Sequence, residues 1–73
     1  MSMRLCEKRL YKPVNDYMRM PQELNKLQDE LIEAGYKVEP RKGPVVIITL
    51  EGGEVHYVPG DGGIWEHIFK GRK

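Results

Sequence analysis

Cysteine, long hydrophobic runs and an excess of charge of one sign are all scarce in this sequence. Cys6 is the only cysteine among 73 residues, so no disulfide can form within the chain, and nothing points to an oxidising compartment. The longest apolar run, Val45 to Ile48, is too short to span a bilayer, and the N-terminus lacks the apolar stretch of a signal peptide. We therefore expect a cytoplasmic protein with no membrane partner.

The formal net charge is only +1, whereas nucleic-acid-binding domains more often carry a concentrated basic surface. The charges are unevenly distributed, because residues 1–20 hold five cationic and two acidic side chains, and residues 21–35 hold one and four. Hydrophobic residues make up 40% of the chain, which is enough to form a core. We predict a single domain over residues 1–73, in which residues 1–20 have no clear structure.

The segment from about residue 21 to residue 34 predicts a helix. Pro21 suits the first turn, where its missing N–H would have had no partner, and Gly35 is a natural left-handed end. Between them, apolar residues recur at spacings of three and four and so share one face: Leu24, Leu27, Leu31 and Ala34. We expect this face to pack on a sheet.

Strands are predicted after the helix at about 36–39, 45–50 and 54–58. The first alternates apolar and charged residues, and the second is rich in β-branched residues. Gly52 and Gly53 permit a two-residue turn, which would place Leu50 opposite Val55. The predicted fold class is therefore α+β, with one helix packed on a three-stranded antiparallel sheet.

Alternation along these strands gives the predicted sheet two different faces. One face should lie beneath the helix and carries Val46, Ile48, Leu50, Val55 and Tyr57. The other face is too apolar to be left entirely in water, and it carries Val45, Ile47, Thr49, His56 and Val58. Its cover is either the N-terminal segment, which contains Leu5, Leu10, Tyr11, Val14 and Tyr17, or the same face of a second copy.

Residues 64–70 predict either a short C-terminal helix or a fourth strand. Ile64, Trp65, Ile68 and Phe69 would share one face of a helix, but these residue types also favour strands. Both alternatives stay open.

Few groups that could perform catalysis or bind a metal are present. His56 and His67 are the candidate acid–base residues, and their spacing with Cys6 matches no zinc motif. The glycine-rich segment Gly60–Gly63 lacks the lysine and the spacing of a nucleotide-binding loop. We therefore predict no catalytic residue, no metal and no cofactor.

Several local features between Leu24 and Phe69 are shared with a known family. They are a helix ending in glycine and an aromatic (Leu31–Tyr36), Arg41–Gly43 before the second strand, the hairpin Glu51–Glu54, Val58–Pro59, and Ile64–Phe69. Together they resemble the double-stranded-RNA-binding-like fold of the HicA toxin family. The resemblance implies a ribonuclease that cleaves messenger RNA and is neutralised by an antitoxin. In that family the lysine-glycine pair is normally followed by serine and the catalytic histidine, where this chain has Pro44 and Val45.

Three functional hypotheses are open. The first is a small non-enzymatic binding protein, of a size that suits a phage or mobile-element inhibitor, which acts as a homodimer or on a protein partner through Val45, Ile47, Thr49, His56 and Val58. The second is RNA or DNA binding, with phosphate contacts from Arg4, Lys8, Arg9, Lys12, Arg41, Lys42, Lys70, Arg72 and Lys73. The third is a HicA-like ribonuclease that uses His56.

Overall fold

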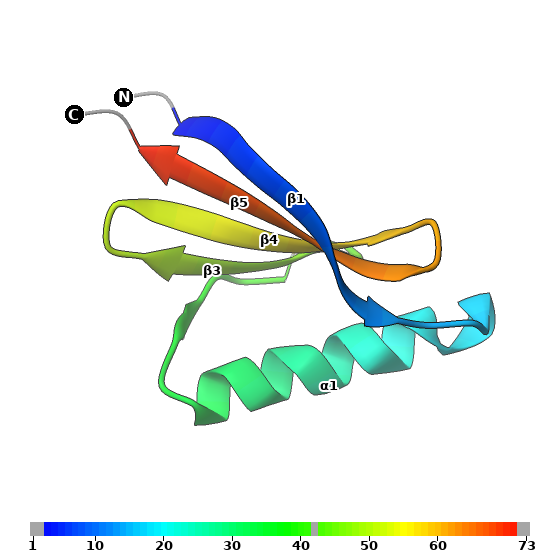
Figure 1. The fold of residues 1–73 in the computed structure, drawn as a ribbon. Helices are drawn as coiled ribbons and strands as arrows, with labels where there is room; N and C mark the ends of the chain where they lie inside the picture. Colours follow the sequence, from blue (N-terminus) through cyan, green and yellow to red (C-terminus); the bar gives the residue numbers. More distant parts are fainter. Residues whose placement is uncertain (1–2, 42, 72–73) are drawn as a thin grey trace.

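The computed structural model describes residues 3–41 and 43–71, and these form one antiparallel sheet with a helix on one side (Figure 1). The sheet has five strands in the order β1-β5-β4-β3-β2. Their bounds are β1 Met3–Pro13, β2 Lys37–Val38, β3 Val46–Leu50, β4 Gly53–Gly60 and β5 Gly63–Gly71. One turn of 3-10 helix, Tyr17–Arg19, leads from β1 into the helix α1, Met20–Glu33.

The helix α1 confirms the element predicted over residues 21–34. Pro21 lies in its first turn, and Met20, Leu24, Leu27 and Leu31 form its buried stripe. After the helix, Gly35 has a φ of +94°, its N–H bonds the Ile32 carbonyl, and the Tyr36 N–H bonds the Leu31 carbonyl. These two bonds satisfy carbonyls at the helix end that would otherwise lack partners, so the chain turns back toward the sheet at that point.

The prediction of a three-stranded sheet is wrong, because the N-terminal segment also forms a strand. β1 is an edge strand that pairs along its length with β5, with irregularities between Leu5 and Glu7 and between Leu10 and Lys12. Cys6 and Tyr11 are the extra residues at these bulges, and each bulge reverses the side to which the following residues point. The two reversals conceal the alternation in the sequence, which is why no strand was predicted within residues 1–20.

The segment 64–70 is a strand, so the alternative of a short helix is wrong. Asp61 and Gly62 form the turn before it, and Gly62 has a φ of +85°. β5 then pairs with β4 on one side and β1 on the other. Hydrogen bonds from two neighbouring strands outweigh the local helical spacing of its apolar residues.

The β3–β4 hairpin differs from its predicted register by two residues. Leu50 pairs with Gly53, and the turn is Glu51–Gly52 rather than Gly52–Gly53. Gly53 is paired as the first residue of β4. The position requires glycine, because a Cβ atom there would lie 2.2 Å from the carbonyl oxygen of Phe69 on β5. A shift of two residues leaves every side chain on its predicted face, so the two faces of β3 and β4 are as expected.

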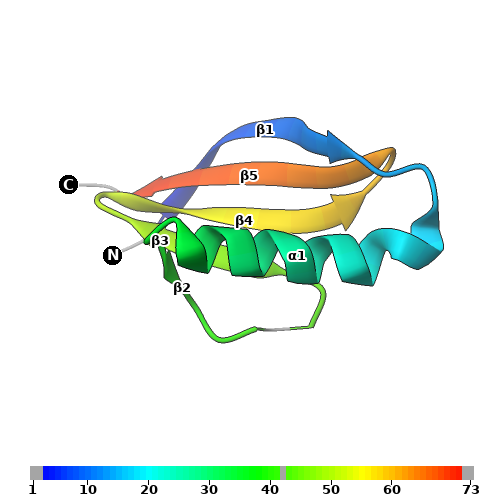
Figure 2. The same cartoon turned by 90° about the horizontal axis from the view of Figure 1, so that it is seen from below.

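The core fills the space between α1 and one face of the sheet. Its buried residues are Met20, Leu24, Leu27, Leu31, Val46, Ile48, Val55, Tyr57 and Ile64. Figure 2 shows α1 lying along β3 and β4, with β1 beyond the edge of the helix. Leu50, which was expected beneath the helix, is 40% exposed at the end of its strand.

No described element lies on the other face of the sheet. The N-terminal segment was one of the two predicted covers, but it lengthens the sheet as β1 and does not fold over it. In the part of the chain that the structure describes, no helix is long and apolar enough to cross a membrane.

Candidate interaction surface

The uncovered side of the sheet, called the open face below, carries the side chains that alternate with the core positions. Residues paired across neighbouring strands point to the same side, so the pairing register defines its members. They are Leu5, Lys8 and Leu10 on β1; Trp65, His67 and Phe69 on β5; Glu54, His56 and Val58 on β4; Val45, Ile47 and Thr49 on or beside β3; and Lys37 and Glu39 on or beside β2.

These side chains form rows that run across the strands. The middle row runs Glu39, Ile47, His56, His67, Lys8, and the Glu39 N–H bonds the Ile47 carbonyl at 2.9 Å. The row on one side of it is entirely apolar and runs Val58, Trp65, Leu10. The row on the other side runs Lys37, Thr49, Glu54, Phe69, Leu5.

The five residues predicted to bind a partner all lie on the open face and are all partly buried: Val45, Ile47, Thr49, His56 and Val58. The two polar residues of this set, Thr49 and His56, contact neighbouring side chains on the same face. Thr49 donates its hydroxyl to Glu39 at 3.1 Å, and His56 Nε2 lies 2.9 Å from a carboxylate oxygen of Glu54. The His56 ring also packs against Phe69 at 4.4 Å between centroids.

The sequence interpretation missed the contribution of β5 to this surface. As a helix, the segment would have placed Trp65 and Phe69 beside Ile64 and Ile68. As a strand, it buries Ile64 and turns Trp65 and Phe69 to the opposite side, in line with His67. The alternation of Ile64, Glu66 and Ile68 with three aromatic rings was the available signal.

Trp65 is fixed in place at one end of the open face. Its indole N–H donates to the Asp61 carbonyl at 2.7 Å. A Cβ atom on Gly60 would lie 2.6 Å from the indole Cδ1, so the ring packs directly on glycine backbone. Beside it is a shallow hollow of about 350 Å³, lined by Lys8, Val58, Pro59, Gly60, Asp61, Trp65 and His67.

His67 lies between Lys8 and His56 in the middle row. Partial burial lowers the pKa of His67, and the nearby Lys8 and His56 lower it further because they disfavour a second positive charge. The neutral ring is therefore favoured at the centre of this face around neutral pH.

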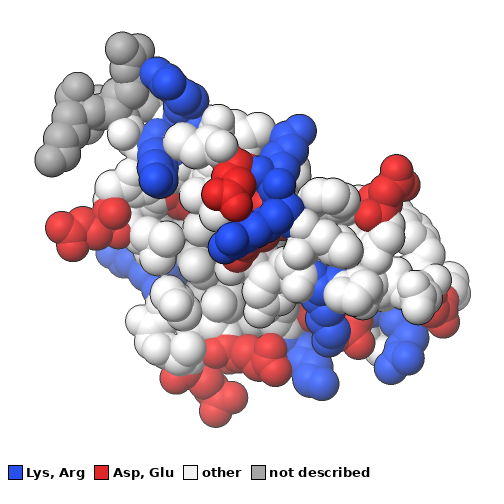
Figure 3. Space-filling view, in the orientation of Figure 1, with Lys and Arg blue, Asp and Glu red and all other residues white. Residues whose placement is uncertain are grey.

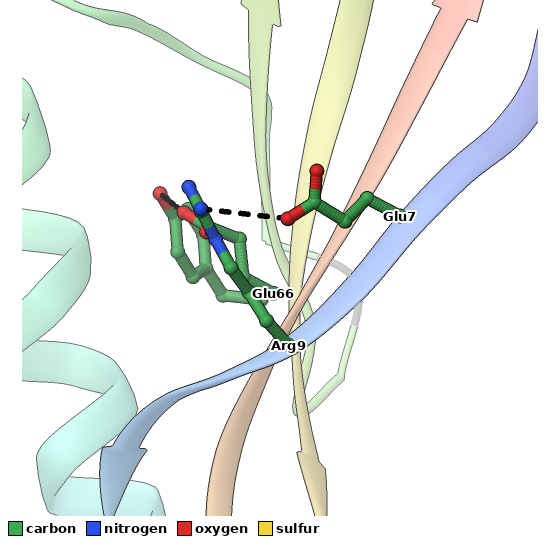
Figure 4. A network of polar contacts seen from close by, with 4 residues as sticks. Glu7, Arg9 and Glu66 are labelled. Carbon is green, nitrogen blue, oxygen red and sulfur yellow. Dashed lines mark hydrogen bonds and ion pairs between the residues drawn. The ribbon is translucent and has the colours of Figure 1, made fainter.

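A polar network lies on the helix side of the sheet, where β1 passes beyond α1 (Figure 4). Glu66 is only 8% exposed, and its two carboxylate oxygens accept hydrogen bonds from Arg9 Nε at 2.7 Å and from the Tyr57 hydroxyl at 2.8 Å. Arg9 also pairs with Glu7 at 3.4 Å. Burial and the adjacent Glu66 raise the pKa of Tyr57, while the bond to Glu66 raises the pKa of Arg9. The network joins β1 to β5 and β4, so we interpret it as structural.

Among the cations predicted to contact nucleic acid that the structure describes, Arg4, Arg9, Lys12 and Lys70 share the helix side of β1 and β5, but Arg9 and Lys12 are paired there with carboxylates. Lys8 is on the open face, whereas Arg4 and Lys70 face each other across β1 and β5 on the helix side. The others are engaged locally: Arg9 pairs with Glu66, Lys12 pairs with Glu23, and Arg41 donates to Asn25, Gln28 and Gly43. Lys42, Arg72 and Lys73 lie outside the described residues.

Figure 3 shows one side of the molecule, where basic and acidic side chains are interspersed around β1 and along the margin formed by α1. Within residues 3–41 and 43–71, no group of three or more His, Cys, Asp or Glu side chains is placed to hold a metal ion. The open face is therefore the surface on which the predicted partner-binding residues come together.

Comparisons of this chain with protein-family models, with curated proteins and with solved structures found no match. Its function is therefore inferred from the open face itself.

Proposed function

We propose that this chain is a small non-enzymatic binding protein that docks a protein partner on the open face of its sheet. The observation that supports this is a sheet face with no covering element, in which apolar and aromatic side chains predominate, Lys8, Lys37 and Glu39 lie at the outer strands and Glu54 lies near one end of β4. Such an arrangement is typical of protein interfaces, where charged residues are depleted from the core and aromatic residues are enriched there.

The apolar centre favours a partner that removes it from water. Ile47, Val58, Trp65 and Phe69 are each partly accessible, and with Leu5 and Leu10 they place apolar side chains on both sides of the row that contains His56, His67 and Lys8. Apolar and aromatic side chains gathered on one face of a folded chain often mark an interaction site. Tryptophan is also among the residue types that contribute most binding energy at interface centres.

The charges on the open face favour a protein over a nucleic acid. Lys8 and Lys37 are balanced by Glu39 and Glu54, so the face has no net formal charge when its histidines are neutral. A polyanion gains most of its affinity by releasing counterions to a cationic surface, and this face offers no such excess.

A pair of isoleucine-to-lysine variants tests the proposal. Ile47→Lys places a charge at the centre of the open face, and the matched control Ile32→Lys places one on the outer side of α1, where Ile32 is 53% exposed. Tagged wild type and both variants are incubated with extract of the organism that encodes the chain, and the retained protein and nucleic acid are analysed. Light scattering measures the mass of each purified chain, and urea denaturation verifies that both variants fold.

We expect the wild type to retain a protein or to self-associate, Ile32→Lys to behave in the same way, and Ile47→Lys to lose the interaction. Identical retention by the two variants would place the binding surface elsewhere. Retention of nucleic acid that falls steeply with salt would support the nucleic-acid hypothesis in its place, and a monomer that retains nothing would contradict the proposal.

A further inference from the structure

We propose that the partner on the open face is a second copy of this chain, docked face to face about a two-fold axis parallel to β4. This inference rests on the proposed function and names its partner. The argument comes from the position of opposite charges at the two ends of one row.

The size of the core provides the first reason. Nine hydrophobic residues of the described chain are buried, all between α1 and one side of the sheet, and a chain of 73 residues buries a smaller share of its surface than a larger domain does. A second copy would give the other side of each sheet the apolar layer that it lacks. Two sheets pack in this way at about 10 Å and at an angle of about 30°.

The charge pattern provides the second reason. Glu39 ends the middle row beside β3, and Lys8 ends the same row on β1. Three strands separate these two ends, so at about 4.8 Å per strand they lie roughly 19 Å apart and cannot pair within one chain. A surface that docks on its own copy must be self-complementary, and two opposite charges at opposite ends of one row satisfy that condition.

The direction of the axis follows from these charges. Rotation about an axis along β4, the central strand, exchanges the two ends of each row, so Glu39 faces Lys8 of the second copy, and this contact occurs twice. Rotation about an axis across the strands would instead bring each of these charges against its own counterpart. Only the first arrangement pairs unlike charges, and charge complementarity of this kind fixes the register of an interface.

The same axis gives an apolar centre. Val58 then lies next to the axis, with Trp65 beside it on β5. Glu54 is the charged residue closest to the axis. Its carboxylate oxygen lies 2.9 Å from Nε2 of His56 in its own chain. The crossing angle of the two sheets moves the two Glu54 side chains apart.

Charge reversal at the two ends of the row tests the inference. Lys8→Glu and Glu39→Lys are made separately and together, and sedimentation measures the dissociation constant of each chain alone and of an equimolar mixture of the two single variants. Either single variant brings like charges together twice, so we expect its dissociation constant to rise at least about tenfold above that of the wild type.

The mixture and the double variant carry the decisive results. In the mixture, a chain with two acidic row ends meets a chain with two basic ends, so a heterodimer should form with an affinity close to that of the wild-type dimer. The double variant Lys8→Glu/Glu39→Lys reverses both charges and should also regain dimerisation. Trp65 is the only tryptophan and lies on the open face, so its fluorescence reports association independently.

Other outcomes overturn the inference. A wild-type chain that stays monomeric at high concentration contradicts it. If that monomer captures another protein, and Ile47→Lys abolishes the capture, the proposed function still holds while the homodimer does not. A wild-type dimer whose single variants weaken without recovery in the mixture or the double variant contradicts the two-fold axis. Urea midpoints close to that of the wild type show that lost association does not result from unfolding.

Discussion

Replacing Gly63 by alanine should loosen the attachment of β1 to the rest of the sheet. Gly63 begins β5 opposite Pro13, the last residue of β1, and has a φ of +149°. A Cβ atom there would lie 2.1 Å from the carbonyl oxygen of Lys12 and 2.6 Å from the backbone nitrogen of Val14. Both contacts are with backbone, so no side-chain rotation can relieve them and the end of β1 must move away.

The expected loss can be estimated from two contributions. A positive φ in a residue with a side chain costs roughly 1–2 kcal/mol, and overpacking a tight contact costs roughly 1–3 kcal/mol, so Gly63→Ala should lower the free energy of unfolding by about 2–5 kcal/mol. A domain of this length has a total of about 4–11 kcal/mol, so the variant should be close to unfolding.

The neighbouring glycine provides a matched control. Gly62 also has a positive φ, +85°, but a Cβ atom there meets nothing within 4 Å, so Gly62→Ala should lose only the conformational contribution, about 1–2 kcal/mol. Urea denaturation followed by Trp65 fluorescence compares the two variants, because Trp65 lies on β5 opposite Leu10 of β1. Equal losses in the two variants would show that β1 does not approach β5 as described.

Two further predictions concern residues on the helix side of the sheet. Burial and Glu66 hold the pKa of Tyr57 above its ordinary value near 10, so the unfolded chain ionises first, and stability that is complete below pH 10 should fall as the pH rises above it. The variant Tyr57→Phe should lack this part of the alkaline loss when urea midpoints are measured between pH 8 and pH 11, and an identical loss in both proteins would refute the assignment. Ile64 is fully buried, so Ile64→Ala should lower the free energy of unfolding by about 2–5 kcal/mol, whereas Ile32→Ala on the outer side of α1 should change it little; equal urea midpoints would contradict this location of the core.

The sequence predicted best those elements whose pattern has a single period. Leu24, Leu27 and Leu31 recur with the helical period between a proline and a glycine, and they form the buried stripe of α1. The side chains of β3 and β4 also face the predicted sides, although the hairpin register was wrong. An error of two residues preserves the alternation, so Ile47 and His56 still belong to the open face.

The two outer elements could not be predicted because their structure depends on contacts far away in the sequence. The bulges at Cys6 and Tyr11 interrupt the alternation of side chains along β1. All residues of β1 are also exposed, so the segment has no alternation of buried apolar and exposed polar residues that a sequence could reveal. In β5, Trp65 and Phe69 satisfy a helical and an extended spacing equally well, and pairing with two strands decides between them. The part of the candidate surface that comes from these strands was missed for the same reason.

The pairing of β1 with β5 also determines the order in which the chain can fold during synthesis. Arg9 and Glu66, which join these strands, are 57 positions apart, so at about 5–20 residues per second β1 waits several seconds on the ribosome for its partner. During that interval the N–H and C=O groups of its backbone have no strand to bond. Its density of lysine and arginine side chains discourages pairing with other nascent chains in the meantime.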